Sequence, residues 1–198
     1  MQGFFAIVLA AGASTRMGRC KAGLPWVHHQ SLLAYQTAQI LAAELTPVVV
    51  LGTHNAERAV DCPQGSVVVI NPSPERGKVS SIQTGLRALP EAWEGVMILA
   101  VDQPRPAAVY RRLLQRYVEK RSPITVPVFG DRLGHPALFD QTLRPELENL
   151  SEESQGLRAV VRSYDWILDR VWFDHPTVLQ DLNTPEEYAI ALSQFETL

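Results

Sequence analysis

The stretch FFAIVLAAGASTRMGRCKAGLPW, residues 4–26, decides how the rest of the chain is interpreted. It begins with an unbroken apolar run, Phe4–Ala10, which predicts a strand buried on both faces. The run leads directly into a loop that contains Gly12, Arg16 and Lys21. Small residues let the backbone N–H groups of such a loop approach a ligand closely, and the basic side chains add positive charge. The stretch therefore predicts a buried strand that ends in an anion-binding loop.

Further short apolar runs rich in valine and isoleucine also predict strands buried on both faces, at 47–51, 67–70, 96–101 and 124–128, with another at 167–173. Longer stretches whose apolar residues have helical spacing lie between and after them, at 31–45, 79–89, 106–120 and 184–195. In the last of these, Thr184 is the expected N-cap and Pro185 the first helical residue. Strands that alternate with helices predict βαβ units and a mostly parallel sheet.

The length, composition, charge and cysteine content of the chain limit the classes of protein to which it can belong. The 198 residues, 46% hydrophobic and 20% charged, predict one globular domain spanning 1–198. A net charge of −3 argues against a nucleic-acid partner. Cys20 and Cys62 are too few and too far apart for a disulfide framework or a zinc site. No apolar run reaches the roughly 20 residues that cross a bilayer, and no basic leader precedes the first run, so we expect a cytoplasmic protein without a membrane partner.

Polar clusters follow several of the predicted strands, at 11–21, 71–81, 102–105 and 181–184. In an open α/β sheet, ligands bind beyond the carboxyl ends of the strands, so these clusters predict one shared site. The loop after the first strand has neither the spacing of a Walker A loop nor that of a dinucleotide-binding G-x-G-x-x-G. The segment GDRLGHPALFD, residues 130–140, interrupts the alternation and is interpreted as a short irregular or antiparallel insertion.

The pattern L-A-A-G-x-S-x-R-M-G-x-x-K at residues 9–21 resembles the motif of the MobA-like nucleotidyltransferases, and within them most closely the molybdenum cofactor cytidylyltransferases. Other stretches extend the resemblance over nearly the whole chain: NPSPERGKVSSIQTGL (71–86), DQP (102–104), GHPALF (134–139), GLRAVV (156–161) and DLNTPEEY (181–188). The resemblance implies a three-layer α/β/α fold of the Rossmann-like nucleotide-diphospho-sugar transferase type. Its mixed sheet would be mostly parallel, and an acceptor-side insertion would span roughly 128–165.

The resemblance also implies the chemistry: a phosphate on an acceptor attacks the α-phosphorus of a nucleoside triphosphate and displaces pyrophosphate, with Mg²⁺ or Mn²⁺ as cofactor. Arg16, Lys21 and Asp102 are then the expected catalytic residues. Asp102 and Asp181 would ligate the metal, with Asn183 as a further candidate, and His135 and Arg158 would contact the acceptor. The expected nucleotide-binding residues are Leu9, Ala10, Ala11, Gly12, Arg16, Lys21, Asn71, Gly77, Ser81 and Asp102.

CTP is the favoured nucleotide, because guanylyl-transferring relatives tend to have Gly-Gly where this chain has Ala11-Gly12. A methyl group at Ala11 would narrow the pocket toward a pyrimidine. Asn183 departs from the Asp that is usual in cytidylyltransferases. The favoured acceptor is molybdopterin, with a molybdoenzyme as a candidate further partner. The alternatives are guanylyl transfer to the same cofactor, nucleotidyl transfer to a sugar phosphate, or a chaperone that binds nucleotide or molybdenum cofactor without catalysis.

Overall fold

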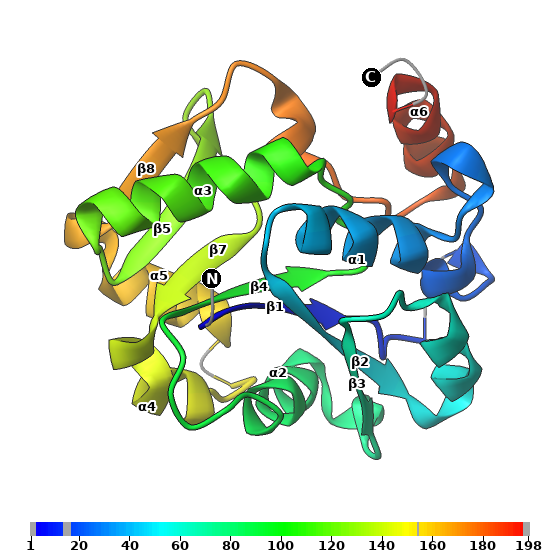
Figure 1. Cartoon of the computed structure of the whole chain (residues 1–198), viewed down its shortest axis with the longest axis horizontal. Helices are drawn as coiled ribbons and strands as arrows, with labels where there is room; N and C mark the ends of the chain where they lie inside the picture. Colours follow the sequence, from blue (N-terminus) through cyan, green and yellow to red (C-terminus); the bar gives the residue numbers. More distant parts are fainter. Residues whose placement is uncertain (1–2, 14–16, 154, 196–198) are drawn as a thin grey trace.

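The computed structural model describes residues 3–13, 17–153 and 155–195, which form an α/β fold around one eight-stranded mixed sheet (Figure 1). The strand order is β3-β2-β1-β4-β7-β5-β6, and β8 also pairs with β5. The strands are β1 (Phe4–Leu9), β2 (Thr46–Gly52), β3 (Val67–Asn71), β4 (Gly95–Ala100), β5 (Ile124–Phe129), β6 (Arg132–Leu133), β7 (Ala137–Asp140) and β8 (Asp169–Trp172). The expected strands are therefore present, with boundaries that shift by one or two residues.

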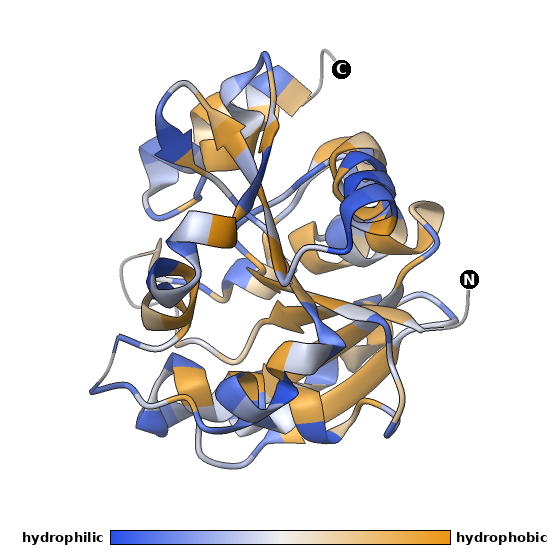
Figure 2. Ribbon diagram, turned by 90° about the vertical axis from the view of Figure 1, so that its left-hand side faces the viewer, coloured by the Kyte–Doolittle hydropathy of each residue, from blue (hydrophilic) through white to orange (hydrophobic). Residues whose placement is uncertain are grey.

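Helices cover both faces of the sheet, which gives the predicted three layers. Helices α1 (Leu32–Ala42) and α3 (Ala107–Lys120) lie on one face (Figure 1). Helices α2 (Lys78–Arg87), α4 (Arg144–Glu148) and α5 (Leu157–Ser163) lie on the other. The central strands are apolar along their length, because both of their faces are covered (Figure 2). No helix of the described segments is long and apolar enough to span a membrane.

The pairing of the strands is mostly parallel, as predicted, with one antiparallel departure. Strands β1 to β4 pair in parallel in the order β3-β2-β1-β4, and β8 runs parallel to β5. The segment expected to be an irregular or antiparallel insertion forms β6 and β7, and β7 lies antiparallel between β4 and β5. It is thus an interior strand of the sheet. The expectation of strands buried on both faces is wrong for β3, which lies at the sheet edge, where Val67 and Ile70 are 39% and 40% exposed. It is also wrong for β8, where Trp172 is 58% exposed.

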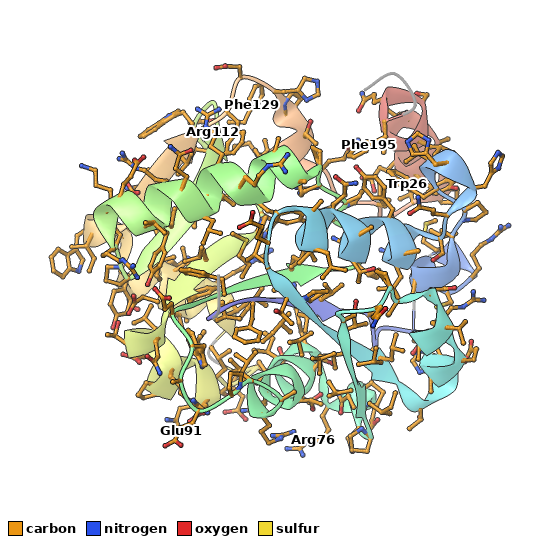
Figure 3. All side chains as sticks on the ribbon, in the orientation of Figure 1. Trp26, Arg76, Glu91, Arg112, Phe129 and Phe195 are labelled. Atoms are coloured by element: carbon orange, nitrogen blue, oxygen red, sulfur yellow. The ribbon has the colours of Figure 1, made fainter. Side chains whose placement is uncertain are left out.

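A third apolar cluster attaches the C-terminal helix α6 (Pro185–Phe195) to the segment that follows the first loop. Trp26 packs against the rings of Tyr35, Tyr188 and Phe195, with its ring centroid 5.2 Å from that of Phe195 (Figure 3). Thr184 caps α6 as expected: its Oγ1 accepts a hydrogen bond from the Glu187 N–H, and the Glu187 carboxylate accepts from the Thr184 N–H in return. Aromatic packing and capping together hold α6 against the segment that contains Trp26 and Tyr35.

Candidate active site

A large cleft opens at the carboxyl ends of β1 and β4. The chain leaves β1 toward β2 on one side and reaches β4 on the other, so this is the point where the strand order reverses and where open α/β sheets bind ligands. The cleft has a volume of about 1220 Å³. That exceeds the usual range of roughly 300–1,000 Å³ for small-molecule sites, so it has room for two substrates side by side. Its walls include the predicted residues Leu9, Ala11, Gly12, Lys21, Gly77, Ser81, Asp102, His135, Arg158, Asp181 and Asn183.

An ion pair between Lys21 and Asp102 forms part of the wall of this cleft. Lys21 begins a short 3₁₀ turn, Lys21–Gly23, and Asp102 follows the end of β4. The Lys21 Nζ lies 2.6 Å from the Asp102 Oδ2, and the two side chains are only 9% and 19% exposed. The same ammonium donates to the Oδ1 of Asn183 at 3.4 Å. Residues separated by 81 and 162 positions along the chain therefore meet at one point.

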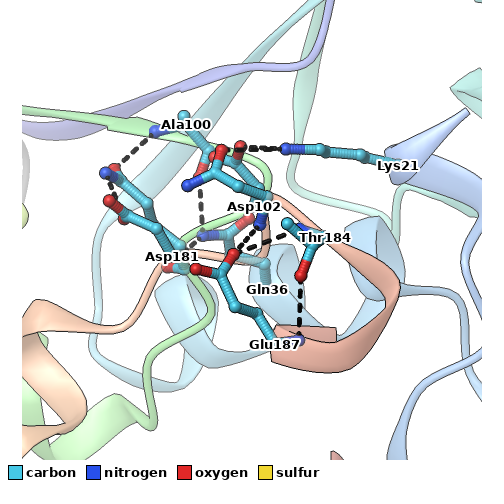
Figure 4. Close-up of polar contacts among 9 residues, drawn as sticks. Lys21, Gln36, Ala100, Asp102, Asp181, Thr184 and Glu187 are labelled. Carbon is cyan, nitrogen blue, oxygen red and sulfur yellow. Dashed lines mark hydrogen bonds and ion pairs between the residues drawn. The ribbon is translucent and has the colours of Figure 1, made fainter. Parts of the chain in front are cut away.

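A second carboxylate, Asp181, is held by a neutral side chain. The Gln103 Nε2 donates to the Asp181 Oδ1 at 2.8 Å, while the Gln103 Oε1 accepts from the Ala100 N–H at 3.0 Å. The neighbouring backbone joins the two carboxylate-bearing segments, since the Leu182 N–H donates to the Asp102 carbonyl at 2.9 Å. Figure 4 shows Asp102 and Asp181 in this network, with Lys21 approaching Asp102 from the side of the first loop.

Arg105 joins the segments that carry the site. Its guanidinium is fully buried and donates to four backbone carbonyls, those of Pro104, His135, Val178 and Gln180, at 2.8–3.0 Å. Burial lowers the pKa of Arg105 to about 10, and the negative charges of Asp181 and Asp102 oppose that shift, so the group stays protonated at neutral pH. The sequence analysis did not single out Arg105, because nothing in DQPRP shows that three of its four partners lie 30 to 75 residues away.

The structure brings most, but not all, of the expected nucleotide-binding residues to the cleft. Leu9, Ala11 and Gly12 line one side, and Gly77 and Ser81 line the side formed by α2. Alternation along the chain turns Ala10 to the opposite face, where it is buried in the core beside α1 and α3. Asn71 is buried too: it donates to the hydroxyls of Ser80 and Ser81 and accepts from the Ser73 N–H, so it braces the start of α2. Arg16 lies outside the described residues.

The far end of the cleft combines an apolar floor with basic side chains. Its floor is formed by residues of the central strands, Ile98, Val126, Ala137 and Phe139. The expected acceptor residues His135 and Arg158 lie on its walls, together with the basic residues Lys78, Arg132 and Arg162, which the sequence analysis missed. Desolvation by the cleft walls lowers the pKa of His135; Arg105, Lys78 and Arg158 add to this shift, and Asp181 opposes it. This end suits a ligand with an apolar body and an anionic group.

The oxygen atoms of Asp102, Asp181 and Asn183 are a donor set that suits Mg²⁺ or Mn²⁺. All three side chains line the same cleft, and hard divalent cations prefer carboxylate and amide oxygens. Within the described ranges there is no cluster of three or more His, Cys, Asp and Glu side chains that could hold a metal by protein ligands alone. Such a cation commonly uses one or two carboxylates and completes its shell with water and substrate phosphates, so the set present fits it.

The sheet is mostly parallel, and the point where its strand order reverses carries a glycine-containing loop, a lysine and two carboxylates. These features are typical of α/β proteins that bind nucleotides. Residues 6–169 match the model of the MobA-like NTP transferase domain. The chain therefore belongs to the MobA-like NTP transferase family, as the resemblance of its motifs had indicated, and this is a family of nucleotidyltransferases that bind nucleoside triphosphates.

Known relatives cover nearly the full chain. Nicotine blue oxidoreductase of Paenarthrobacter nicotinovorans is 26% identical over 91% of this chain and 92% of its own length. The crystal structure of Rv0371c from Mycobacterium tuberculosis H37Rv is 25% identical, with a TM-score of 0.83 over 96% of this chain and 98% of that one. A further structure of Rv0371c is a complex with manganese. A nucleotidyl transferase from Methanothermobacter thermautotroptrophicus shares the fold, with a TM-score of 0.82 over 98% of both chains at 21% identity.

Proposed function

We propose that this chain is a Mg²⁺-dependent cytidylyltransferase that transfers CMP from CTP to the phosphate of molybdopterin or molybdenum cofactor and releases pyrophosphate. The observation that carries the proposal is the Lys21–Asp102 ion pair at the switch point of the sheet, inside a cleft large enough for two substrates. It supplies a cation for a triphosphate and a carboxylate for a metal at one place. Such a reaction needs little covalent chemistry from the protein, because positioning and charge neutralisation carry it.

In this proposal the nucleotide lies between the β1 loop and α2. Leu9, Ala11 and Gly12 contact the base and ribose on one side, and Gly77 and Ser81 close the other. Lys21 and Arg16 bind the triphosphate. An oxygen of the acceptor phosphate forms a new bond to the α-phosphorus as the bond from that phosphorus to the bridging α–β oxygen breaks. The two basic side chains offset the charge that develops on the departing pyrophosphate.

Asp102 and Asp181 would hold the divalent cation, with Asn183 as a further oxygen donor. When bound, the cation supplies Lewis-acid polarisation of the phosphate oxygens. The manganese complex of Rv0371c supports the use of a divalent metal in proteins of this fold. The chain's own contribution is to keep the two carboxylates on adjacent segments, through the hydrogen bond from the Leu182 N–H to the Asp102 carbonyl.

The acceptor side would be built by the segment 128–165 of a single domain. Arg158 and His135 would bind its phosphate, and the apolar floor would support its ring system. The same floor speaks against the sugar-phosphate alternative, because a sugar would leave its hydroxyl groups facing Val126, Ala137 and Phe139 without hydrogen-bond partners. The presence of both Lys21 and Asp102 speaks against a chaperone that binds nucleotide without catalysis.

The test is pyrophosphate release by the purified full chain with Mg²⁺ and each of the four nucleoside triphosphates, with and without molybdenum cofactor. We expect release with CTP and cofactor together. Asp102→Asn should abolish it, whereas Asp174→Asn, at an exposed carboxylate that does not line the cleft, should not. Cofactor-dependent release with GTP alone would overturn the choice of base.

The name of the curated relative sets a second arm of the same test. Because Paenarthrobacter nicotinovorans nicotine blue oxidoreductase is similar over 91% of this chain, consumption of a reduced nicotinamide dinucleotide is measured in parallel with a redox dye as acceptor. We expect none. Turnover in that assay, without pyrophosphate release from any triphosphate, would replace the transferase assignment by a redox one.

A further inference from the structure

Gln103 is a buried amide that contacts both the end of β4 and one of the two site carboxylates. It is 5% exposed, its Oε1 accepts from the Ala100 N–H, and its Nε2 donates to the Asp181 Oδ1. We propose that Gln103 is a positioning residue, which fixes one carboxylate oxygen of Asp181 so that the other is presented to the metal. This inference rests on the proposed function, since it takes Asp181 as a metal ligand.

The orientation of the Gln103 amide is dictated by its two partners. A backbone N–H can only donate, so the amide oxygen must face Ala100, and an ionised carboxylate can only accept, so the NH₂ group must face Asp181. A flipped amide would lose both hydrogen bonds. The side chain therefore has one stable orientation, and it transmits the position of the β4 backbone to the Asp181 carboxylate.

The backbone that carries Gln103 is itself held in place. The Gln36 side chain of α1, fully buried, donates to the Gln103 carbonyl at 2.8 Å and to the Ala100 carbonyl at 3.3 Å (Figure 4). The Gln103 N–H closes the turn by donating to the Ala100 carbonyl at 3.0 Å. Helix α1, the end of β4 and Asp181 thus form one connected polar network in a mostly buried region, where such bonds are strong.

The chemistry of the donor explains why an amide suits this place. A lysine beside Asp181 would neutralise the carboxylate that a metal needs, whereas a neutral amide orients it and leaves its charge in place. Partners that orient metal-binding carboxylates in this way commonly change metal affinity by about 10- to 100-fold when they are mutated. Asp102 differs, because its partner in the structure is the Lys21 ammonium.

The test uses two variants that separate the hydrogen bond to Ala100 from that to Asp181. Gln103→Met keeps the size of the side chain and removes both bonds. Gln103→Glu keeps an oxygen for the Ala100 N–H, and with it the fold of the turn, but sets a carboxylate oxygen against the Asp181 Oδ1. The matched controls are Gln115→Met and Gln115→Glu, on the exposed face of α3.

Mn²⁺ binding is measured by electron paramagnetic resonance on the full chain with a non-hydrolysable CTP analogue, and melting temperatures are recorded in parallel. We expect both Gln103 variants to bind Mn²⁺ about tenfold or more weakly and both controls to bind like the wild type. Gln103→Glu should also lower the melting temperature, because two carboxylates then face each other in a mostly buried place. The affinity for the analogue without metal should be unchanged. Turnover, where it is measured, should show a raised KM for Mg²⁺ with a smaller change in kcat.

Wild-type Mn²⁺ affinity in Gln103→Met, which removes the hydrogen bond to Asp181 without adding a charge, would overturn the inference. Asp181→Asn distinguishes a failure of the positioning role of Gln103 from a failure of the proposed metal site. If it weakens Mn²⁺ binding and the Gln103 variants do not, the proposed metal site stands and the positioning role falls. If Asp181→Asn also binds Mn²⁺ like the wild type, Asp181 is no metal ligand and both assignments fall together.

Discussion

If Asp102 binds the divalent cation as proposed, Lys21 competes with that cation for the carboxylate, so removing the charge of Lys21 should strengthen metal binding in the absence of nucleotide. Its Nζ lies 2.6 Å from the Asp102 Oδ2, and a cation that binds this oxygen must first displace the ammonium. The two side chains are 9% and 19% exposed, so the pair is intermediate between an exposed and a buried ion pair. An exposed ion pair stabilises a protein by about 0–1 kcal/mol, and disrupting a buried one costs about 3–5 kcal/mol. We therefore expect that displacing the ammonium costs Mn²⁺ about 1–2 kcal/mol of binding free energy, so that removing it lowers the Kd for Mn²⁺ roughly 5- to 30-fold.

The assay is a calorimetric titration of the full chain with Mn²⁺ and no nucleotide, comparing the wild type with Lys21→Met. Lys120→Met, at the exposed end of α3, is the control for a lost positive charge. A titration with CTP should move in the opposite direction, because Lys21→Met removes a phosphate-binding cation. Unchanged or weaker Mn²⁺ binding by Lys21→Met would refute the reasoning, since it would show that the ammonium does not compete for Asp102.

Two further substitutions test the role of Arg105 in joining the segments of the site and the role of Ala11 in the choice of nucleotide. Arg105→Lys should lower the free energy of unfolding by about 3 kcal/mol, measured by urea denaturation, because a single ammonium cannot reach all four carbonyls that the buried guanidinium satisfies. An unchanged urea midpoint would contradict the role of Arg105 as the joint between these segments. Ala11→Gly should shift the CTP/GTP ratio of kcat/KM by about tenfold toward GTP, because it removes a methyl group from the cleft wall. A constant ratio would reject the argument from pocket width.

The fold follows from sequence patterns where the signal is local and strong. Continuous apolar runs gave the four central strands β1, β2, β4 and β5 because both faces of those strands are buried. The same pattern wrongly predicted that β3 is buried on both faces, because a run of valines does not show whether a strand lies inside a sheet or at its edge. The place of β7 between β4 and β5 was not predictable either, since the four residues ALFD carry no information about which strands they join.

The candidate site was predictable where charged residues follow strands, and not where side chains contact distant backbone. Asp102 directly follows the apolar run of β4, and Lys21 lies in the loop that follows β1. Because β1 and β4 are adjacent parallel strands, both polar segments lie at the same edge of the sheet. The hydrogen bonds of Gln103 to Asp181 and of Arg105 to the carbonyls of His135 and Gln180 cross 30 to 78 residues, and no periodicity encodes them. Lys78 of α2 and Arg162 of α5 both line the cleft, which also depends on tertiary packing.

The two carboxylates of the site are held in different ways, and this difference implies an order of events. Asp181 accepts from the neutral amide of Gln103, whose own oxygen accepts from the Ala100 N–H, so this partner does not compete with a cation for the carboxylate. Asp102 is paired with a lysine that a triphosphate would attract toward its own phosphates. Nucleotide binding would then remove the competitor from Asp102 and supply phosphate oxygens for the same cation. The metal should therefore bind tightly only together with the nucleotide. The positive charge of the metal, which activates the phosphate, would then be present only when the substrate is bound.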